Sequence, residues 1–146
     1  MILDLRKIAA SGKDVCEFYF EYVPETELSS VPNVVLNLPV KVEGKITLTG
    51  KHQAYIECDI AFKLKGECTR CLAETEKDYY ITVNEEVRPD NDDGYSVVND
   101  TINLKPIVED AVIMNMPVSF LCKEDCKGIC SVCGVNLNVG TCKCEK

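Results

Sequence analysis

Regular alternation of apolar and polar residues dominates the first two thirds of the chain. Within residues 38–50, Val40, Val42 and Ile46 share one face, while lysine, glutamate and threonine side chains occupy the other. After a short turn, residues 56–65 alternate in the same way. Period-two alternation is typical of strands with one buried face. The pattern therefore predicts a long antiparallel hairpin with a single apolar face.

Two shorter segments extend this sheet. The run VCEFYFEYV, residues 15–23, places its aromatic residues on one side. Tyr79, Ile81 and Val83 alternate with polar residues in the same manner. Both segments are predicted to be further strands of the same sheet.

A helical period appears near residues 106–116. Pro106 stands near its start, apolar residues recur at helical spacing, and Pro117 follows. These signals predict a short helix that packs on the sheet. The predicted fold class is α+β, a mainly antiparallel β-sheet with a short helix and a C-terminal Cys-rich, zinc-ribbon-like tail.

The tail differs in composition from the rest of the chain. Residues 121–146 are rich in cysteine, glycine, lysine and asparagine and contain few large apolar residues. Such a segment needs a metal or a cross-link to fold, because it cannot bury enough apolar surface. We therefore expect two parts: an antiparallel β-sheet domain at 1–120 and a Cys-rich metal-binding tail at 121–146.

The charge of the chain is acidic and uneven. The net charge is −8, and residues 74–110 alone carry three basic against eleven acidic residues. An acidic chain lacks the basic face that phosphate contacts need, and it suits a basic protein partner better. Residues 89–100 are predicted to form a solvated loop, because the ligand spacing of a calcium loop is missing.

Location decides how the ten cysteines are interpreted. The N-terminus does not resemble a signal peptide, and no apolar run is long enough to span a membrane. A cytoplasmic location is therefore expected, where closely spaced cysteines are metal ligands or catalytic thiols more often than disulfides. Disulfides between these cysteines would require that the protein be exported to an oxidising compartment.

Eight of the ten cysteines fall into close pairs. Cys16 and Cys58 lie singly on apolar strand faces and are expected to be buried as small hydrophobic residues. CSVCG is the strongest local signal, because a C-x-x-C turn followed by glycine lets two sulfurs chelate one ion. The paired cysteines are assigned to a first metal site at Cys130, Cys133, Cys142 and Cys144, and a second at Cys68, Cys71, Cys122 and Cys126.

The second grouping is the more open one. A mixed site that draws on both sets, or plain structural thiols, would use the same cysteines, and spacing does not decide which pairs meet. A thiol redox role for CTRC (68–71) lacks the following helix that would lower a thiol pKa. Zinc is preferred to an iron–sulfur cluster, since the spacings do not follow ferredoxin patterns.

Evidence for catalysis is missing from the sequence. Sites closed by four sulfurs are of the structural type, whereas catalytic zinc keeps an open position. His52 stands alone in a predicted turn and is expected to be exposed, and Glu85 and Glu86 point to opposite faces of a strand. We therefore expect no enzyme activity, structural zinc as the cofactor, and no small-molecule substrate.

Three segments together resemble a known family. GECTRCL (66–72), the helix ending at MNMP (114–117) and LCKEDCKGICSVCGVNLN (121–138) are similar to the bacterial YceD family, the large ribosomal RNA subunit accumulation proteins. The resemblance implies a role in ribosome biogenesis that supports accumulation or processing of large-subunit rRNA. It also implies a basic large-subunit ribosomal protein, or the rRNA itself, as partner.

The acidic charge favours the protein partner over broad RNA contact. Direct RNA binding through a local basic patch is the alternative. The side chains available for that patch are Lys63, Lys65, Arg70, Lys123, Lys127 and Lys143.

Overall fold

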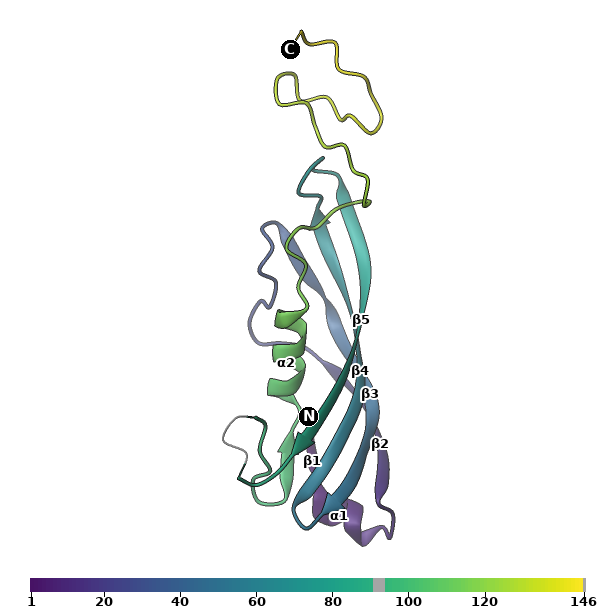
Figure 1. Ribbon diagram of the computed structural model, residues 1–146, viewed down its shortest axis with the longest axis vertical. Helices are drawn as coiled ribbons and strands as arrows, with labels where there is room; N and C mark the ends of the chain where they lie inside the picture. Colours follow the sequence, from purple (N-terminus) through teal and green to yellow (C-terminus); the bar gives the residue numbers. More distant parts are fainter. Residues whose placement is uncertain (91–93, 146) are drawn as a thin grey trace.

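The computed structural model describes residues 1–90 and 94–145. Its long axis runs along the strands, and the C-terminal tail extends beyond one end of the sheet (Figure 1). The described elements, in chain order, are β1 (Ile2–Asp4), α1 (Leu5–Ala10), β2 (Val15–Tyr22), β3 (Val34–Gly50), β4 (Gln53–Glu67), β5 (Glu74–Val87), β6 (Thr101–Asn103) and α2 (Lys105–Met114).

The main sheet has four antiparallel strands in the order β2-β3-β4-β5. Each strand pairs with the next in the sequence, so alternation along one strand is aligned with alternation along its neighbour. Val42 of β3 lies opposite Ile60 of β4, and Ile60 lies opposite Ile81 of β5. This register gathers the apolar residues of all four strands on one face. β1 and β6 form a separate two-stranded sheet.

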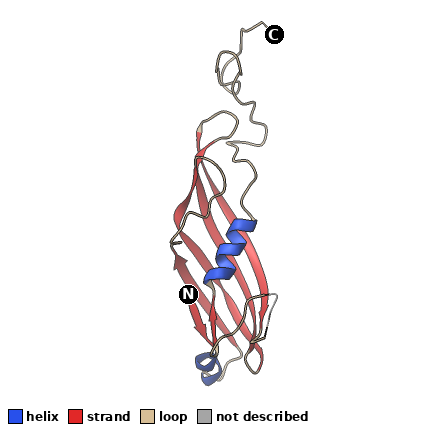
Figure 2. Cartoon of the chain, turned by 90° about the vertical axis from the view of Figure 1, so that its left-hand side faces the viewer, coloured by secondary structure: helices blue, strands red, loops and turns tan. Residues whose placement is uncertain are grey.

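The core lies between that apolar face and α2. Ile46, Ile56 and Ile60 are fully buried on the sheet side. α2 lies across the same face (Figure 2), with Ile107 and Val108 buried against it. The opposite face carries charged side chains that pair across strands, as Lys45 and Glu57 do at 3.0 Å.

Two glycines let the long strands approach each other closely. An added Cβ at Gly44 would lie 2.2 Å from the Glu57 carbonyl oxygen, and one at Gly66 would lie 2.2 Å from the Asn33 carbonyl oxygen. Both neighbours are backbone atoms that cannot move aside. Glycine is therefore required at both positions for the strands to keep this geometry.

The structure confirms the predicted fold class, and it extends three of the four predicted strands, whereas β2 ends one residue before the predicted run 15–23 does. β3 begins four residues before the predicted run, and β5 reaches from residue 74 to 87. α1, β1 and β6 were not predicted, because elements of three to six residues show too little periodicity. Of the expected acidic loop, residues 91–93 lie outside the described residues. No helix in the described part of the chain is long and apolar enough to cross a membrane.

Single residues that drew attention in the sequence have ordinary surroundings. Cys58 is buried, and Cys16 is half-buried at the edge of the same core. Burial, with the neighbouring Asp59 carboxylate, raises the pKa of Cys58 to about 11. His52 is exposed in the turn between β3 and β4, and its Nδ1 contacts the Asp100 carboxylate.

Candidate metal centres

The tail reaches the end of the sheet through an ordered connection. After α2, the chain runs along the sheet toward the turn between β4 and β5, which carries CTRC (Figure 1). Phe120 is fully buried there. Its carbonyl oxygen accepts hydrogen bonds from Thr69, at 2.7 Å from the backbone N–H and 3.3 Å from the hydroxyl. The two cysteine-bearing segments are therefore held side by side by backbone contacts as well as by sulfur.

The first cluster, here called the sheet-end site, consists of Cys68, Cys71, Cys122 and Cys126. Their sulfur atoms all lie within 4.8 Å of one another. The Sγ atoms of Cys68 and Cys126 are 3.7 Å apart, and those of Cys71 and Cys122 are 3.5 Å apart. Cys68 is fully buried. The structure thus brings the β4–β5 turn and the start of the tail to one point.

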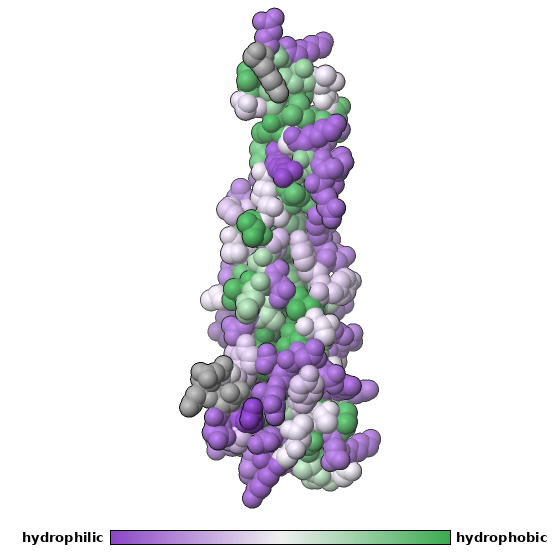
Figure 3. Space-filling view, viewed as in Figure 1, coloured by the Kyte–Doolittle hydropathy of each residue, from purple (hydrophilic) through white to green (hydrophobic). Residues whose placement is uncertain are grey.

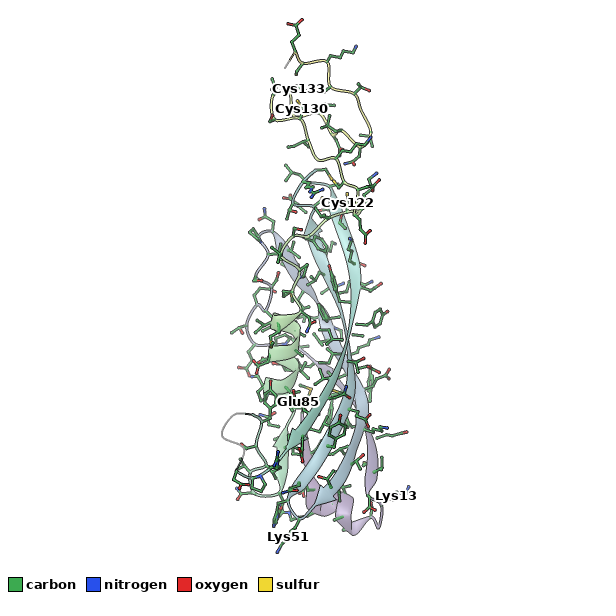
Figure 4. The ribbon with its side chains drawn as sticks, viewed as in Figure 1. Lys13, Lys51, Glu85, Cys122, Cys130 and Cys133 are labelled. Atoms are coloured by element: carbon green, nitrogen blue, oxygen red, sulfur yellow. The ribbon has the colours of Figure 1, made fainter. Side chains whose placement is uncertain are left out.

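The second cluster, here called the tail site, consists of Cys130, Cys133, Cys142 and Cys144. These four sulfurs also lie within 4.8 Å of one another. Cys142 Sγ is 3.2 Å from Cys130 Sγ and 3.8 Å from Cys133 Sγ. Cys133 is exposed and the other three are half-buried. This cluster lies near the far end of the molecule, where Figure 4 labels Cys130 and Cys133.

Both clusters are built on the same backbone turn. In the sheet-end site, Leu72 N–H donates to the Cys68 carbonyl at 2.9 Å, and Cys68 N–H donates to the Ala73 carbonyl at 2.9 Å. In the tail site the corresponding bonds run from Gly134 to Cys130 and from Cys130 to Val135, again at 2.9 Å. The residue after the second cysteine has a positive φ in both turns, 61° at Leu72 and 72° at Gly134. Glycine adopts this conformation without strain, and leucine does not.

Backbone N–H groups in these turns point at sulfur. Burial raises the pKa of Cys68, but backbone hydrogen bonds from Cys71, Cys122 and Arg70 outweigh it and lower the pKa to about 6. Backbone N–H groups of Cys133 and Val132 likewise lower the pKa of Cys130 to about 6. The turns therefore stabilise thiolates, the form in which cysteine binds metal.

Other thiols in the same clusters are held protonated. Burial, together with a hydrogen bond to Cys71, raises the pKa of Cys122 to about 12. In the tail site, hydrogen bonds to Cys142 and Cys133 raise the pKa of Cys144 to about 11. Four thiolates this close repel one another, so all four ionise together only when a cation lies between them.

The distances fit a tetrahedral ion. A zinc ion with four sulfurs at about 2.3 Å defines a tetrahedron with edges of about 3.8 Å. The sulfur separations of 3.5 and 3.7 Å in the sheet-end site and 3.8 Å in the tail site are close to that value, and the Cys130–Cys142 separation of 3.2 Å in the tail site is shorter. All ten cysteines are free thiols in the structure. Each cluster could therefore hold one metal ion.

Arg70 fastens the tail to the sheet end. Its Nη1 donates to the Cys126 carbonyl at 3.1 Å, and its own carbonyl accepts from Ile129 N–H at 3.2 Å. Gly128, with φ of +75°, packs against the Arg70 backbone. The side chain counted above among the RNA-contact candidates is therefore engaged in the junction between the two sites.

Asn138 connects the two sites and had no signal in the sequence. Its Oδ1 accepts from Lys127 N–H at 2.9 Å, and its Nδ2 donates to Cys126 Sγ at 3.4 Å. The amide hydrogen bond lowers the pKa of Cys126 against the effect of burial, which raises it. A side chain from the loop of the tail site therefore contacts a cysteine of the sheet-end site.

The remaining basic candidates are divided between two surfaces. Lys63 lies on the charged face of the sheet, 2.8 Å from Glu76 and 3.6 Å from Asp78. Lys65 is exposed on the same face, directly opposite Glu76. The tail lysines, all exposed, are Lys123, Lys127 and Lys143. The structure does not gather the six basic candidates into one patch.

Comparisons with known proteins match between about half and three quarters of the chain. Over 87 residues, the chain is 32% identical to the uncharacterized protein Rv2926c of Mycobacterium tuberculosis, covering 53% of this chain and 42% of that protein. Over 83 residues it is 33% identical to ML1660 of Mycobacterium leprae, covering 51% and 38%. With YlbN of Bacillus subtilis it shares 23% identity over 116 residues, covering 73% and 67%.

The chain spans less than half the length of the mycobacterial relatives it matches. No solved structure matches it. The family model described as "Large ribosomal RNA subunit accumulation protein YceD" matches residues 56–146, a stretch that contains most of β4, all of β5 and α2, and all eight paired cysteines. The chain therefore belongs to the YceD family.

Proposed function

We propose that this protein is a non-catalytic ribosome-biogenesis factor that supports the accumulation or processing of large-subunit rRNA, with structural zinc at both cysteine sites. The observation that carries this proposal is the family match over residues 56–146, which includes both sites in full. The family is named for accumulation of that RNA. The same proposal places the protein in the cytoplasm.

Zinc is supported by the donor set and its geometry. Four thiolates per site, at tetrahedral separations, match closed structural zinc centres and leave no open position for a substrate. In the sheet-end site the metal would join the sheet to the tail, and in the tail site it would fold the tail itself. The division into a sheet domain (1–120) and a tail (121–146) follows from these two roles and is part of the proposal.

A basic large-subunit ribosomal protein is the proposed partner. The net charge of −8 opposes broad contact with phosphates and favours a basic protein surface. Many residues on the charged face of the sheet, among them Lys41, Glu43 and Glu76, are exposed to solvent, which leaves room for such a partner. In this function the protein would bind or deliver a ribosomal protein during assembly of the large subunit.

Direct RNA binding by the tail is the second candidate. It is favoured by Lys127 and Lys143, which are exposed on a small metal-site module. Phosphate contacts would make RNA affinity fall steeply with salt concentration. A thiol redox role is opposed by burial, since Cys68 is 0% and Cys71 6% exposed, whereas a reactive thiol has to be accessible.

Metal content and bound partners test the proposal. Native mass spectrometry on protein purified under reducing conditions should show two zinc ions per chain. Affinity purification from a lysate treated with ribonuclease should recover a basic large-subunit ribosomal protein. Recovery of rRNA alone, lost after ribonuclease treatment and at moderate salt, would favour the second candidate. Absence of metal would refute the zinc sites.

A further inference from the structure

The outer edge of β5 is open along the whole strand. All fourteen residues of β5 pair with β4, and no other strand in the described residues pairs with it. Apart from the β4 ladder, no backbone hydrogen bond within residues 1–90 and 94–145 reaches positions 74–87. Every second residue of an antiparallel strand directs its N–H and C=O away from its partner. β5 therefore presents a long row of unpaired donors and acceptors, which is a template for another strand.

The same edge is strongly acidic. β5 carries Glu74, Glu76, Asp78, Glu85 and Glu86 against the single Lys77, a net charge of −4. Lys63 of β4 is shared between two of these carboxylates, and Lys65 lies opposite Glu76, so β4 compensates at most two of the charges. Hydrophilic side chains accordingly line the side of the molecule on which the upper part of β5 lies (Figure 3).

The other edge of the sheet provides a comparison. β2 has eight residues, with Glu17 and Glu21 as its only charged side chains. It also has no second partner strand among the described residues. β5 is therefore the longer and the more acidic of the two open edges.

A groove runs beside β5 on the side of the core. It has a volume of about 270 Å³ and lies between β5 and α2, lined by Ile81, Val83 and Met114 among others. Met114 is 83% exposed. Glu85, labelled in Figure 4, lies on β5 next to this groove. A strand added at this edge would place alternate side chains over this groove, whose lining also includes Glu85, Asp110 and Asn115, and over the acidic outer face.

We propose that the β5 edge is the docking surface for an extended, basic segment of a protein partner, which adds to the sheet as a fifth strand. Alternating lysine or arginine and apolar residues would meet the acidic face and the groove in turn. A second copy of this chain is a poor occupant, because pairing β5 with itself would bring together two strands of net charge −4. RNA is disfavoured by the same charge.

This inference rests on the proposed function only where the partner is taken to be a ribosomal protein. The test uses the full, metal-loaded chain and a synthetic probe, a blocked peptide of about ten residues that alternates lysine and valine. A second peptide of identical charge carries N-methyl groups on successive amides, so it cannot pair as a strand. Binding is measured by fluorescence anisotropy, and amide hydrogen exchange locates the bound peptide.

Strand addition predicts three results. The unmodified peptide protects amides of β5 from exchange at least about tenfold, and the N-methylated peptide binds at least about tenfold more weakly. The double variant Glu74→Gln/Glu86→Gln weakens binding about fivefold, because two exposed charges are lost. The control Glu17→Gln/Glu21→Gln removes two charges from the other edge and leaves affinity unchanged.

Other outcomes would overturn the proposal. Equal binding of both peptides would mean charge attraction without strand pairing. Protection of β2 in place of β5 would mean that the peptide docks on the other edge of the sheet. Protection of β5 that rises with protein concentration, without peptide, would mean that a second copy of the chain occupies the edge. A chain that binds the peptide at β5 but recovers no ribosomal protein would refute the proposed partner and keep the docking edge. Undiminished recovery of a ribosomal protein by the Glu74→Gln/Glu86→Gln variant would refute the docking edge and keep the proposed partner.

Discussion

The sheet-end site and the tail site share one turn and differ in what surrounds it. Around Cys68 the turn is continuous with β4, and the neighbouring Phe120 is fully buried in the core. Around Cys130 the described residues of the tail form no comparable core, and Val132 and Val139 are 74% and 88% exposed. Apolar burial can contribute to stability at the first site but hardly at the second. We infer that the cysteines of the sheet-end site would join the tail to the sheet, whereas those of the tail site would take the place of a hydrophobic core.

The largest effect should come from removing one ligand from each site in turn. Cys71→Ser takes away a buried ligand that ties the tail to the sheet, so we expect the free energy of unfolding of the whole chain to fall by several kcal/mol. Structural zinc contributes about 10–16 kcal/mol of binding free energy in small zinc-finger peptides, and the top of that range sets the upper limit. Cys133→Ser, at the equivalent position of the tail site, should loosen only the tail. Chemical denaturation and amide exchange measure both.

The metal count provides the control for this pair. Each variant should retain one zinc ion per chain, because the other site keeps its four ligands. Loss of both ions from Cys133→Ser, or global unfolding by it, would show that the two sites form one cooperative unit through Asn138 and Arg70.

Phe120 tests whether the sheet end depends on packing as well as on metal. It is fully buried, and its carbonyl accepts two hydrogen bonds from Thr69. Phe120→Ala should lower the free energy of unfolding by about 3–5 kcal/mol, as large-to-small core substitutions do. Val118→Ala, two residues earlier at a fully exposed position, should change it by less than about 0.5 kcal/mol. If both variants lowered the free energy of unfolding equally in denaturation experiments, the packing around Phe120 would be contradicted.

Alternation made the sheet predictable, because its period is short and its apolar face is continuous. Val42, Ile46 and Ile60 are all fully buried on the face that the pattern assigned to the core. The N-terminal elements escaped prediction, since α1 has only six residues and β1 three. β1 is positioned by pairing with β6, about a hundred residues further along the chain, and α1 follows it directly. Long-range pairing of this kind leaves no local signal.

The cysteine pairs follow from spacing, whereas their assignment to two groups of four was the more open prediction; in the structure the sulfurs of each predicted group lie within 4.8 Å of one another. C-x-x-C spacing places two sulfurs on one turn, and the structure shows which turns meet. The supporting residues were not predictable: Arg70 contacts the Cys126 carbonyl across 56 positions, and Asn138 contacts Cys126 through its side chain. The charge of Arg70 suggested RNA contact, whereas in the fold its guanidinium donates a hydrogen bond to the Cys126 carbonyl.

Metal release should separate the two sites in time. Cys133 is exposed, whereas Cys68 and Cys126 are buried, so a chelator reaches the tail site more easily. We expect two kinetic phases of equal amplitude when zinc is removed, with the faster one at least about tenfold faster, equivalent to about 1.4 kcal/mol in barrier height. A chromogenic chelator monitors release, and Cys133→Ser identifies the fast phase by abolishing it. A single phase of full amplitude would contradict the difference in exposure.

The smallest effect concerns the one residue by which the two turns differ most. Leu72 has a φ of 61° where the tail site has Gly134, and its side chain is 57% exposed. Leu72→Gly should relieve about 1 kcal/mol of backbone strain. The greater freedom of glycine in the unfolded chain offsets part of that gain, so a net stabilisation of about 0.5 kcal/mol is expected.

Gly134→Ala should act in the opposite direction: an added Cβ meets no atom within 4 Å, so the cost comes from the backbone alone. That cost, about 1 kcal/mol, should appear as roughly fivefold weaker zinc affinity at the tail site in competition titrations. If Leu72→Gly instead weakened the sheet-end site, the leucine side chain would have to make a contact worth more than the strain that it imposes.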